Sequence, residues 1–169
     1  MAPLVVLVGP PGAGKSTVGR LVAEAVGAPF RDTDTDVERT TGLDVGDIFL
    51  LHGEEEFRRY ESAAVVAALG EHPGVLALGG GAVLDPACRE ALAGHRVVFL
   101  DVTIKDAASR VGFNRDRPLL LGNPRAQWVR LMEERRPVYE AVATARVDTD
   151  GKSPHRVADE VVRLVGERS

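Results

Sequence analysis

The feature that most constrains this chain is a glycine-rich segment between a short apolar run and a longer amphipathic one. The segment reads GPPGAGKS over residues 9–16, follows the run LVVLV and precedes a stretch with apolar residues at helical spacing. Glycines let the backbone curl so that successive N–H groups point inward, and the N-terminus of the next helix adds a positive dipole end. Strand, loop and helix in this order predict a phosphate-binding loop whose ligand is a nucleoside triphosphate.

Each part of this loop has an expected role. Lys15 is expected to reach the β- and γ-phosphates, and the hydroxyl of Ser16 is expected to coordinate Mg²⁺. The alternative is a Gly/Pro-rich turn in which Lys15 is a surface charge, and the complete motif between an expected strand and an expected helix argues against it. Contacts to the nucleotide are expected from Gly12, Ala13, Gly14, Lys15, Ser16 and Thr17.

The rest of the chain narrows the class of nucleotide-binding protein. The Asn-Lys-x-Asp motif by which GTPases read the base is absent, since the only lysines are Lys15, Lys105 and Lys152. A motor ATPase usually needs a chain longer than 169 residues. The size therefore favours a small-molecule kinase, which must also bind an acceptor hydroxyl.

Short β-branched runs alternate with helical stretches along the chain. This alternation predicts right-handed crossovers, and hence an α/β fold with a parallel five-stranded sheet in three layers. The expected strands cover residues 4–8, 30–33, 75–78, 97–100 and 146–148, and the clearest helices cover residues 14–26, 85–93 and 154–165.

Two segments depart from the alternation. Residues 33–70 read as helical throughout, whereas residues 112–124 are rich in Gly, Arg, Asn and Pro without periodicity. Insertions near the carboxyl ends of strands commonly hold substrate or cover it. We therefore expect a helical substrate-binding region at about residues 33–61 and a mobile lid at about residues 112–124.

Composition excludes several classes. A length of 169 residues predicts a single domain over residues 1–169, and the single cysteine, Cys88, excludes a disulfide scaffold and favours a cytoplasmic setting. The net charge of −4 argues against nucleic acid as a partner. No apolar run approaches the roughly 18 residues of a membrane span, and no signal peptide is evident. Residues 110–136 contain seven arginines against three acidic residues, which favours a small anionic ligand.

Paired carboxylates follow the second expected strand. Asp32 and Asp34 are separated by one residue, so on an extended chain their side chains point the same way, toward the ligand crevice. One of them could support Mg²⁺ while the other reaches an acceptor hydroxyl. The alternative is that Thr33 or Asp34 caps the next helix.

Two further clusters point to the acceptor. Arg58 and Glu61 share a helix face, so Glu61 could hold the Arg58 guanidinium toward a carboxylate ligand, unless the two form an ordinary surface ion pair. Three glycines at 79–81 follow an expected strand. They form either a turn or a loop whose N–H groups approach a ligand closely, and three in succession favour the loop.

Six motifs in order resemble those of the shikimate kinases, a family of the nucleoside monophosphate kinase-like P-loop class. They are GPPGAGKST, DTD at 32–34, GEEEFRRYE at 53–61, LGGGAV at 78–83, RPLL at 117–120 and RRPVYEAVA at 135–143. The resemblance extends from about residue 4 to residue 165. It implies a P-loop NTPase core, and a monomer that uses ATP and Mg²⁺ to phosphorylate shikimate at its 3-hydroxyl, in the pathway to chorismate and aromatic amino acids.

The resemblance also implies roles for residues around the acceptor. Asp34 matches the residue that meets the ring hydroxyls and accepts the proton of the attacking one. Arg58 and Arg135 match arginines that bind the carboxylate, whereas Arg136 would face about 100° away on a helix. The glycine loop under the ring is matched by Gly79, Gly80 and Gly81. Phe49, Phe57 and Glu61 are expected in the acceptor pocket, although each phenylalanine could instead be plain core.

On the nucleotide side, the resemblance places Asp32 near the Mg²⁺ that Ser16 binds, and Arg110 along the adenine. Arg117, with Pro118 beside it, would lie over the γ-phosphate, where it could stabilise charge and exclude water. The expected catalytic residues are accordingly Lys15, Asp34 and Arg117. Two alternatives remain open at this point, a gluconate-type sugar-acid kinase and an inactive ligand sensor on the same fold.

Overall fold

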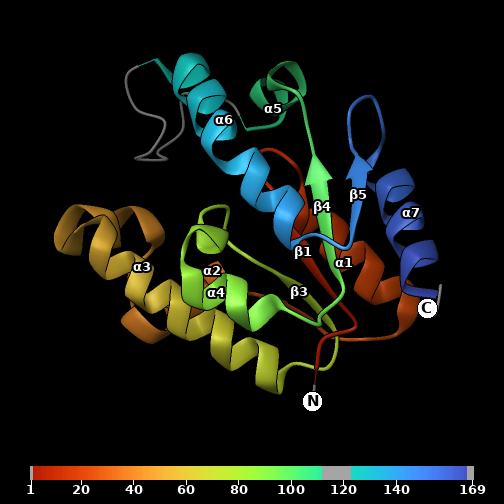
Figure 1. Cartoon of the computed structure of the whole chain (residues 1–169), viewed down its shortest axis with the longest axis horizontal. Coiled ribbons are helices and arrows are strands. Elements are labelled where there is room, and N and C mark those ends of the chain that lie inside the picture. Colours follow the sequence, from red (N-terminus) through yellow and green to blue (C-terminus); the bar gives the residue numbers. More distant parts are fainter. Residues whose placement is uncertain (1, 112–122, 167–169) are drawn as a thin grey trace.

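The computed structural model describes residues 2–111 and 123–166, so Arg117, Pro118 and nearly all of the expected lid lie outside the described residues. It shows a parallel sheet between two layers of helices (Figure 1). The elements in chain order are β1 (Val5–Val8), α1 (Lys15–Val26), β2 (Phe30–Asp32), α2 (Thr33–Thr41), α3 (Val45–Glu71), β3 (Val75–Ala77), the 3₁₀ helix η1 (Ala82–Leu84), α4 (Pro86–Leu92), β4 (Val97–Asp101), α5 (Ile104–Val111), α6 (Pro124–Val142), β5 (Ala145–Asp148) and α7 (Pro154–Gly166).

The sheet has the strand order β2-β3-β1-β4-β5, and every neighbouring pair is parallel. All four residues of the central strand β1 are apolar and buried, as a strand covered on both faces requires. Helices α1 and α7 pack together on one face of the sheet, and α4 and α6 lie on the other (Figure 1). The expected five-stranded parallel sheet in three layers is confirmed.

Residues 33–70 were expected to be helical throughout, and this expectation is wrong: the helical segment is broken twice. Helix α2 ends at Thr41 and is capped by Gly42, whose φ of 73° lies in the left-handed region. Helix α3 starts after Asp44, whose carboxylate accepts from the Asp47 N–H at 2.8 Å. A second break lies inside α3 at Gly53, with φ 82° and ψ 167°. Glycine adopts these conformations without the steric cost that a Cβ imposes, so the chain turns at both points.

Candidate functional site

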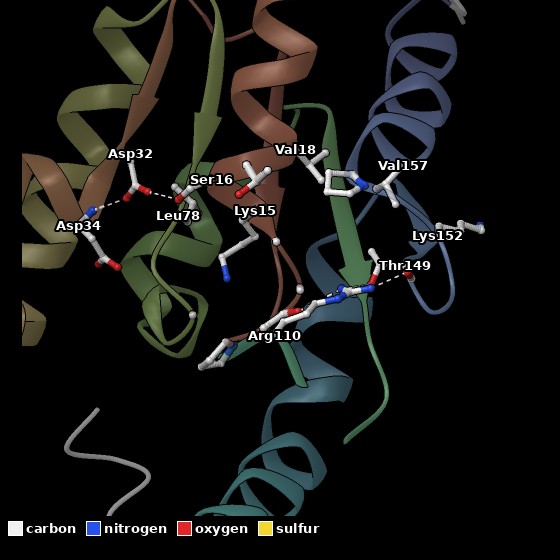
Figure 2. A pocket seen from close by; sticks show the side chains of 17 residues that line it. Lys15, Ser16, Val18, Asp32, Asp34, Leu78, Arg110, Thr149, Lys152 and Val157 are labelled. Carbon is white, nitrogen blue, oxygen red and sulfur yellow. Dashed lines mark hydrogen bonds between the residues drawn. The ribbon is translucent and has the colours of Figure 1, made fainter. Parts of the chain in front are cut away.

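A cavity of about 650 Å³ lies at the carboxyl end of β1, where the glycine-rich loop leads into α1 (Figure 2). Helix α1 begins after Gly14, which has a left-handed φ of 86°. The cavity is lined by all the residues expected to contact the nucleotide from this loop, Gly12, Ala13, Gly14, Lys15, Ser16 and Thr17, and by Asp32, Asp34, Leu78, Gly80, Arg110, Thr149, Lys152, Pro154 and Val157 among others.

The Lys15 ammonium lies against the loop that precedes it. Its Nζ donates to the carbonyl oxygens of Gly9 at 2.7 Å and Pro10 at 3.2 Å. Figure 2 shows the Lys15 side chain between the Ser16–Asp32 pair and the Arg110–Thr149 pair. The helix N-terminus and the ammonium thus give this part of the cavity a positive potential that suits phosphate.

Asp32 links the phosphate loop to helix α2. One carboxylate oxygen, Oδ2, accepts from the Ser16 hydroxyl at 2.7 Å, and the other, Oδ1, accepts from the Asp34 N–H at 2.8 Å. Asp32 itself is therefore the cap of α2, not Thr33 or Asp34. The chain is not extended through Asp34 because the helix starts at Thr33, yet both carboxylates still line the cavity.

The oxygen pair of Ser16 and Asp32 fits a magnesium ion. Mg²⁺ is usually held by one or two protein oxygens together with substrate phosphates and water, so a cage of protein ligands is not required. Across residues 2–111 and 123–166, no group of three or more His, Cys, Asp or Glu side chains could hold a metal by itself. A hydroxyl and a carboxylate beside a phosphate loop are a donor set of the kind that Mg²⁺ uses.

Arg110 joins the phosphate loop to the loop after β5. Its guanidinium donates to the Gly12 carbonyl at 3.1 Å, to the Thr149 hydroxyl at 2.9 Å and to the Thr149 carbonyl at 2.7 Å. The planar group therefore lies along the wall of the cavity on the α7 side (Figure 2). A flat cation in that place can lie against a planar base.

A cluster of charged side chains lies beside this cavity. The Arg58 guanidinium donates to Glu61 Oε1 at 2.7 Å, and the Glu61 side chain is only 3% exposed, so the pair is not an ordinary surface ion pair. Burial raises the pKa of the Glu61 carboxyl above its usual range, and the Arg58 charge opposes that rise without cancelling it. Such a buried pair holds the Arg58 fork in a fixed direction.

The glycine triplet lies where the charged side chains converge. A Cβ at Gly79 would lie 2.5 Å from Asp34 Oδ1 and 2.6 Å from Glu61 Oε2, and a Cβ at Gly81 would overlap the Arg58 guanidinium. These close approaches explain glycine at both positions. We name the four charged residues around the triplet the acceptor cluster: Asp34, Arg58, Glu61 and Arg135.

The two adjacent arginines of α6 point to different places. Arg135 is 5% exposed, and its Nη1 would lie 3.3 Å from a Cβ at Gly80. Arg136 instead donates to Asp101 Oδ2 at 2.6 Å, at the end of β4, and lies over the Phe99 ring. The placement supports Arg135 as the second arginine of the acceptor cluster.

Phe49 and Phe57 pack against each other across the break in α3, with ring centroids 4.7 Å apart. Phe57 belongs to a small apolar cluster with Val37 and Ile48, and Phe49 packs against it. This cluster joins α2 to α3, so it stabilises the helical segment that carries Arg58. Neither ring is among the residues that line the phosphate-loop cavity.

Three polar contacts around the site were not predicted from the sequence motifs. Thr33 accepts from the Gly79 N–H at 3.2 Å, and the Tyr139 hydroxyl donates to the Gly80 carbonyl at 2.5 Å. Trp128 Nε1 donates to the Pro11 carbonyl of the phosphate loop at 3.0 Å. The sequence offered one signal, since Tyr139 lies one helical turn after Arg135 and so shares its face.

Within the part of the chain that the structure describes, no helix has the length and apolar character needed to cross a bilayer.

A family model and curated relatives of this chain carry the same family name. Residues 11–165 match the family model described as Shikimate kinase. The chain is 55% identical over 165 residues to a shikimate kinase of Salinispora arenicola, with 98% of this chain and 99% of that protein covered.

Solved structures agree with this match. The shikimate kinase of Acinetobacter baumannii, solved in complex with shikimate, superposes with a TM-score of 0.92 at 35% identity, covering 98% of this chain and 93% of that one. A gluconokinase from Sinorhizobium meliloti superposes with a TM-score of 0.61 at 21% identity, covering 96% and 90%, a likeness that concerns the fold alone. The fold is the three-layer α/β/α core of the P-loop NTPases.

Proposed function

Because this chain belongs to the shikimate kinase family, as its six motifs predicted, we propose that it transfers the γ-phosphoryl group of ATP to the 3-hydroxyl of shikimate. One observation carries the proposal: Asp34 of the acceptor cluster also lines the phosphate-loop cavity, as does Gly80, which lies beside Arg135 of the cluster. A small acceptor bound in the cluster would therefore lie beside a triphosphate bound in the cavity.

The acceptor cluster suits a hydroxylated carboxylate. Arg58 and Arg135 would bind the carboxylate, because a guanidinium offers a planar fork of donors that matches its two oxygens. Glu61 would hold Arg58 in direction through their ion pair. The glycine triplet would lie under the ring, and Phe49 and Phe57 would support the pocket from the apolar cluster.

The transfer needs a proton acceptor and stabilisation of charge. In the proposed step the 3-hydroxyl oxygen forms a bond to the γ-phosphorus while the bond from that phosphorus to the β–γ bridging oxygen breaks and ADP leaves. Asp34 would accept the hydroxyl proton. Lys15 would stabilise the charge on the transferring group, and we assign the same task to Arg117 of the lid, about residues 112–124.

The nucleotide would be bound by the phosphate loop, with Arg110 along the adenine and Pro118 on the lid side. Ser16 and Asp32 would hold Mg²⁺, which when bound neutralises charge on the β- and γ-phosphates. We further propose that residues 33–61 form the substrate-binding region of a single domain, and that the protein is a cytoplasmic monomer.

A coupled assay of ADP formation tests this proposal. The protein is incubated with ATP and Mg²⁺ and with shikimate, gluconate, quinate or no acceptor, each also without Mg²⁺. We expect ADP to form only in the reaction that contains ATP, Mg²⁺ and shikimate. Turnover of gluconate instead would overturn the acceptor assignment, and nucleotide binding without turnover of any acceptor would support an inactive sensor.

A further inference from the structure

Tyr139 occupies a position that none of the proposed roles uses. It lies on α6, one turn after Arg135, and is fully buried. Its ring stacks on Phe99 of β4 with centroids 5.1 Å apart, which fixes the ring plane. Its hydroxyl donates to the Gly80 carbonyl at 2.5 Å. A buried tyrosine usually directs its hydroxyl to a specific partner, and here that partner is the middle glycine of the triplet.

The Arg135 guanidinium lies beside this hydroxyl, because both groups approach Gly80: the Tyr139 hydroxyl donates to its carbonyl, and Arg135 Nη1 would lie 3.3 Å from a Cβ placed there. Burial raises the pKa of Tyr139, while the charge of Arg135 and its hydrogen bond to the hydroxyl lower it, and the balance is a raised pKa. The phenol therefore remains neutral and keeps its proton. Because a guanidinium has only donors and the single phenol proton is directed at the Gly80 carbonyl, a hydrogen bond between Arg135 and Tyr139 has one possible direction, from the guanidinium to the phenol oxygen.

We call the chain from Arg135 through Tyr139 to Gly80 the relay. The relay restricts the guanidinium of Arg135. A side chain with four rotatable bonds loses much of its freedom when one N–H is directed at a rigid acceptor, and the Tyr139 ring is rigid because Phe99 stacks on it. Arg135 Nη1 also lies close to Gly80, near enough to be 3.3 Å from a Cβ placed there. Arg135 and Tyr139 thus converge on Gly80 at the edge of the acceptor cluster.

We propose that Tyr139 is a positioning residue that orients the Arg135 guanidinium against Gly80 and thereby sets the preference of the site for a carboxylate acceptor. This inference rests on the proposed function, because it takes Arg135 to bind the carboxylate of shikimate. Tyr139 itself does not contact the reacting atoms. Loss of its hydroxyl should therefore lower kcat/KM for an acceptor with a charged carboxylate more than for an acceptor without one.

The test is Tyr139→Phe, which removes the hydroxyl and keeps the ring on Phe99. The measured quantity is the ratio of kcat/KM for shikimate to kcat/KM for its methyl ester, which lacks the negative charge. We expect the ratio to fall roughly tenfold, since a small misplacement of a binding group can cost that much or more. The KM for ATP should stay unchanged. The matched control is Tyr60→Phe, a hydroxyl deletion at the only other tyrosine, which should leave the ratio as it is.

An equal loss for both acceptors would overturn the inference, because general loosening of the site does not distinguish a charged acceptor from a neutral one. So would an unchanged ratio. Both results differ from failure of the proposed function, in which the unsubstituted protein shows no shikimate-dependent ADP formation. In the background of Arg135→Lys, Tyr139→Phe should have little further effect on the ratio, and a full additional loss would contradict the relay.

A second measurement does not depend on Tyr139→Phe being folded. In the Tyr60→Phe protein Tyr139 is the single tyrosine, so incorporation of 3-fluorotyrosine gives one ¹⁹F resonance. We expect saturating shikimate to shift this resonance more than saturating methyl ester does. Equal shifts, or no shift with shikimate, would overturn the inference.

Discussion

At the scale of single residues, Arg58 contacts two carboxylates of its own helix that differ in exposure. Glu61 accepts at 2.7 Å with a side chain that is 3% exposed, whereas Glu54 accepts at 3.3 Å with one that is 56% exposed. Water screens the second pair, so Glu61 fixes the direction of the guanidinium. That direction is toward Gly81, where there is no room for a Cβ.

Arg58→Ala should raise the KM for shikimate on the order of 10- to 100-fold, because it removes a charged hydrogen-bonding partner and leaves Glu61 buried without its cation. The KM for ATP should change little. Arg59→Ala is the matched control, since Arg59 is 67% exposed and pairs with the exposed Glu55. Steady-state kinetics with each substrate varied in turn would check this, and equal effects on both KM values would contradict the assignment.

Gly81→Ala should lower kcat/KM for shikimate by roughly tenfold or more while the protein remains folded. The added methyl group would overlap the Arg58 guanidinium, and the flexible arginine would move away from its position before the backbone does. Gly70→Ala is the control, because a Cβ there meets nothing within 4 Å. If Gly81→Ala kept full activity toward shikimate, the close approach of Arg58 to the triplet would not matter for binding.

At the scale of elements, Asp101 holds three of them together. Its Oδ2, at the end of β4, accepts from Arg136 of α6 at 2.6 Å and from Arg146 of β5 at 3.0 Å. Burial by itself would raise the pKa of the Asp101 carboxyl, but the hydrogen bonds from the two arginines outweigh it, and the pKa is lowered. The ionised form is thus the one that the fold stabilises.

This shift predicts a dependence of stability on pH. A folded pKa below the unfolded value of about 3.9 contributes stability that is fully present above that pH and is lost as the pH falls through the folded pKa. Asp101→Asn should therefore reduce the free energy of unfolding by about 1–3 kcal/mol at pH 7. The difference from the unsubstituted protein should shrink below about pH 4.

Urea unfolding at several pH values measures this difference. Asp148→Asn is the control, because Asp148 also pairs with Arg146 but is 56% exposed, and its loss should cost at most about 1 kcal/mol. A difference for Asp101→Asn that stayed constant down to pH 2 would show that the carboxylate charge has no part in holding β4, α6 and β5 together.

The elements also differ in how far sequence predicted them. The five strands and the phosphate loop followed from apolar runs and glycine spacing, because these patterns depend on local burial and backbone freedom. The break at Gly53 was missed because a glycine in a helical pattern is often tolerated. The Asp101–Arg136 pair spans 35 residues, and no local pattern reports such a contact.

At the scale of the whole molecule, the parallel sheet gathers the site. The order β2-β3-β1 brings Asp32, the glycine triplet and the phosphate loop to the carboxyl ends of adjacent strands. The sequence predicted that each motif follows a strand, and the carboxyl ends of parallel strands lie at one edge of a sheet. It did not predict the relay from Arg135 through Tyr139 to Gly80, because that depends on how α6 packs over β4.

Helix α6 connects the two halves of this arrangement. Trp128 reaches the phosphate loop, and one end of the same helix carries Arg135 and Tyr139 toward the glycine triplet. A single helix thus contacts both the proposed nucleotide site and the proposed acceptor site. This geometry brings the two reactants together and should favour direct transfer of the phosphoryl group between them.

Identification of the phosphorylated product tests the central claim most directly. The protein is incubated with ATP, Mg²⁺ and shikimate, ADP is quantified, and the phosphorus-containing products are resolved by ³¹P NMR. We expect a single new phosphomonoester, equimolar with ADP, whose phosphorus couples to the proton on carbon 3 of shikimate. Inorganic phosphate released in its place, or an ester on another carbon, would contradict a site that holds the 3-hydroxyl between Asp34 and the phosphate loop.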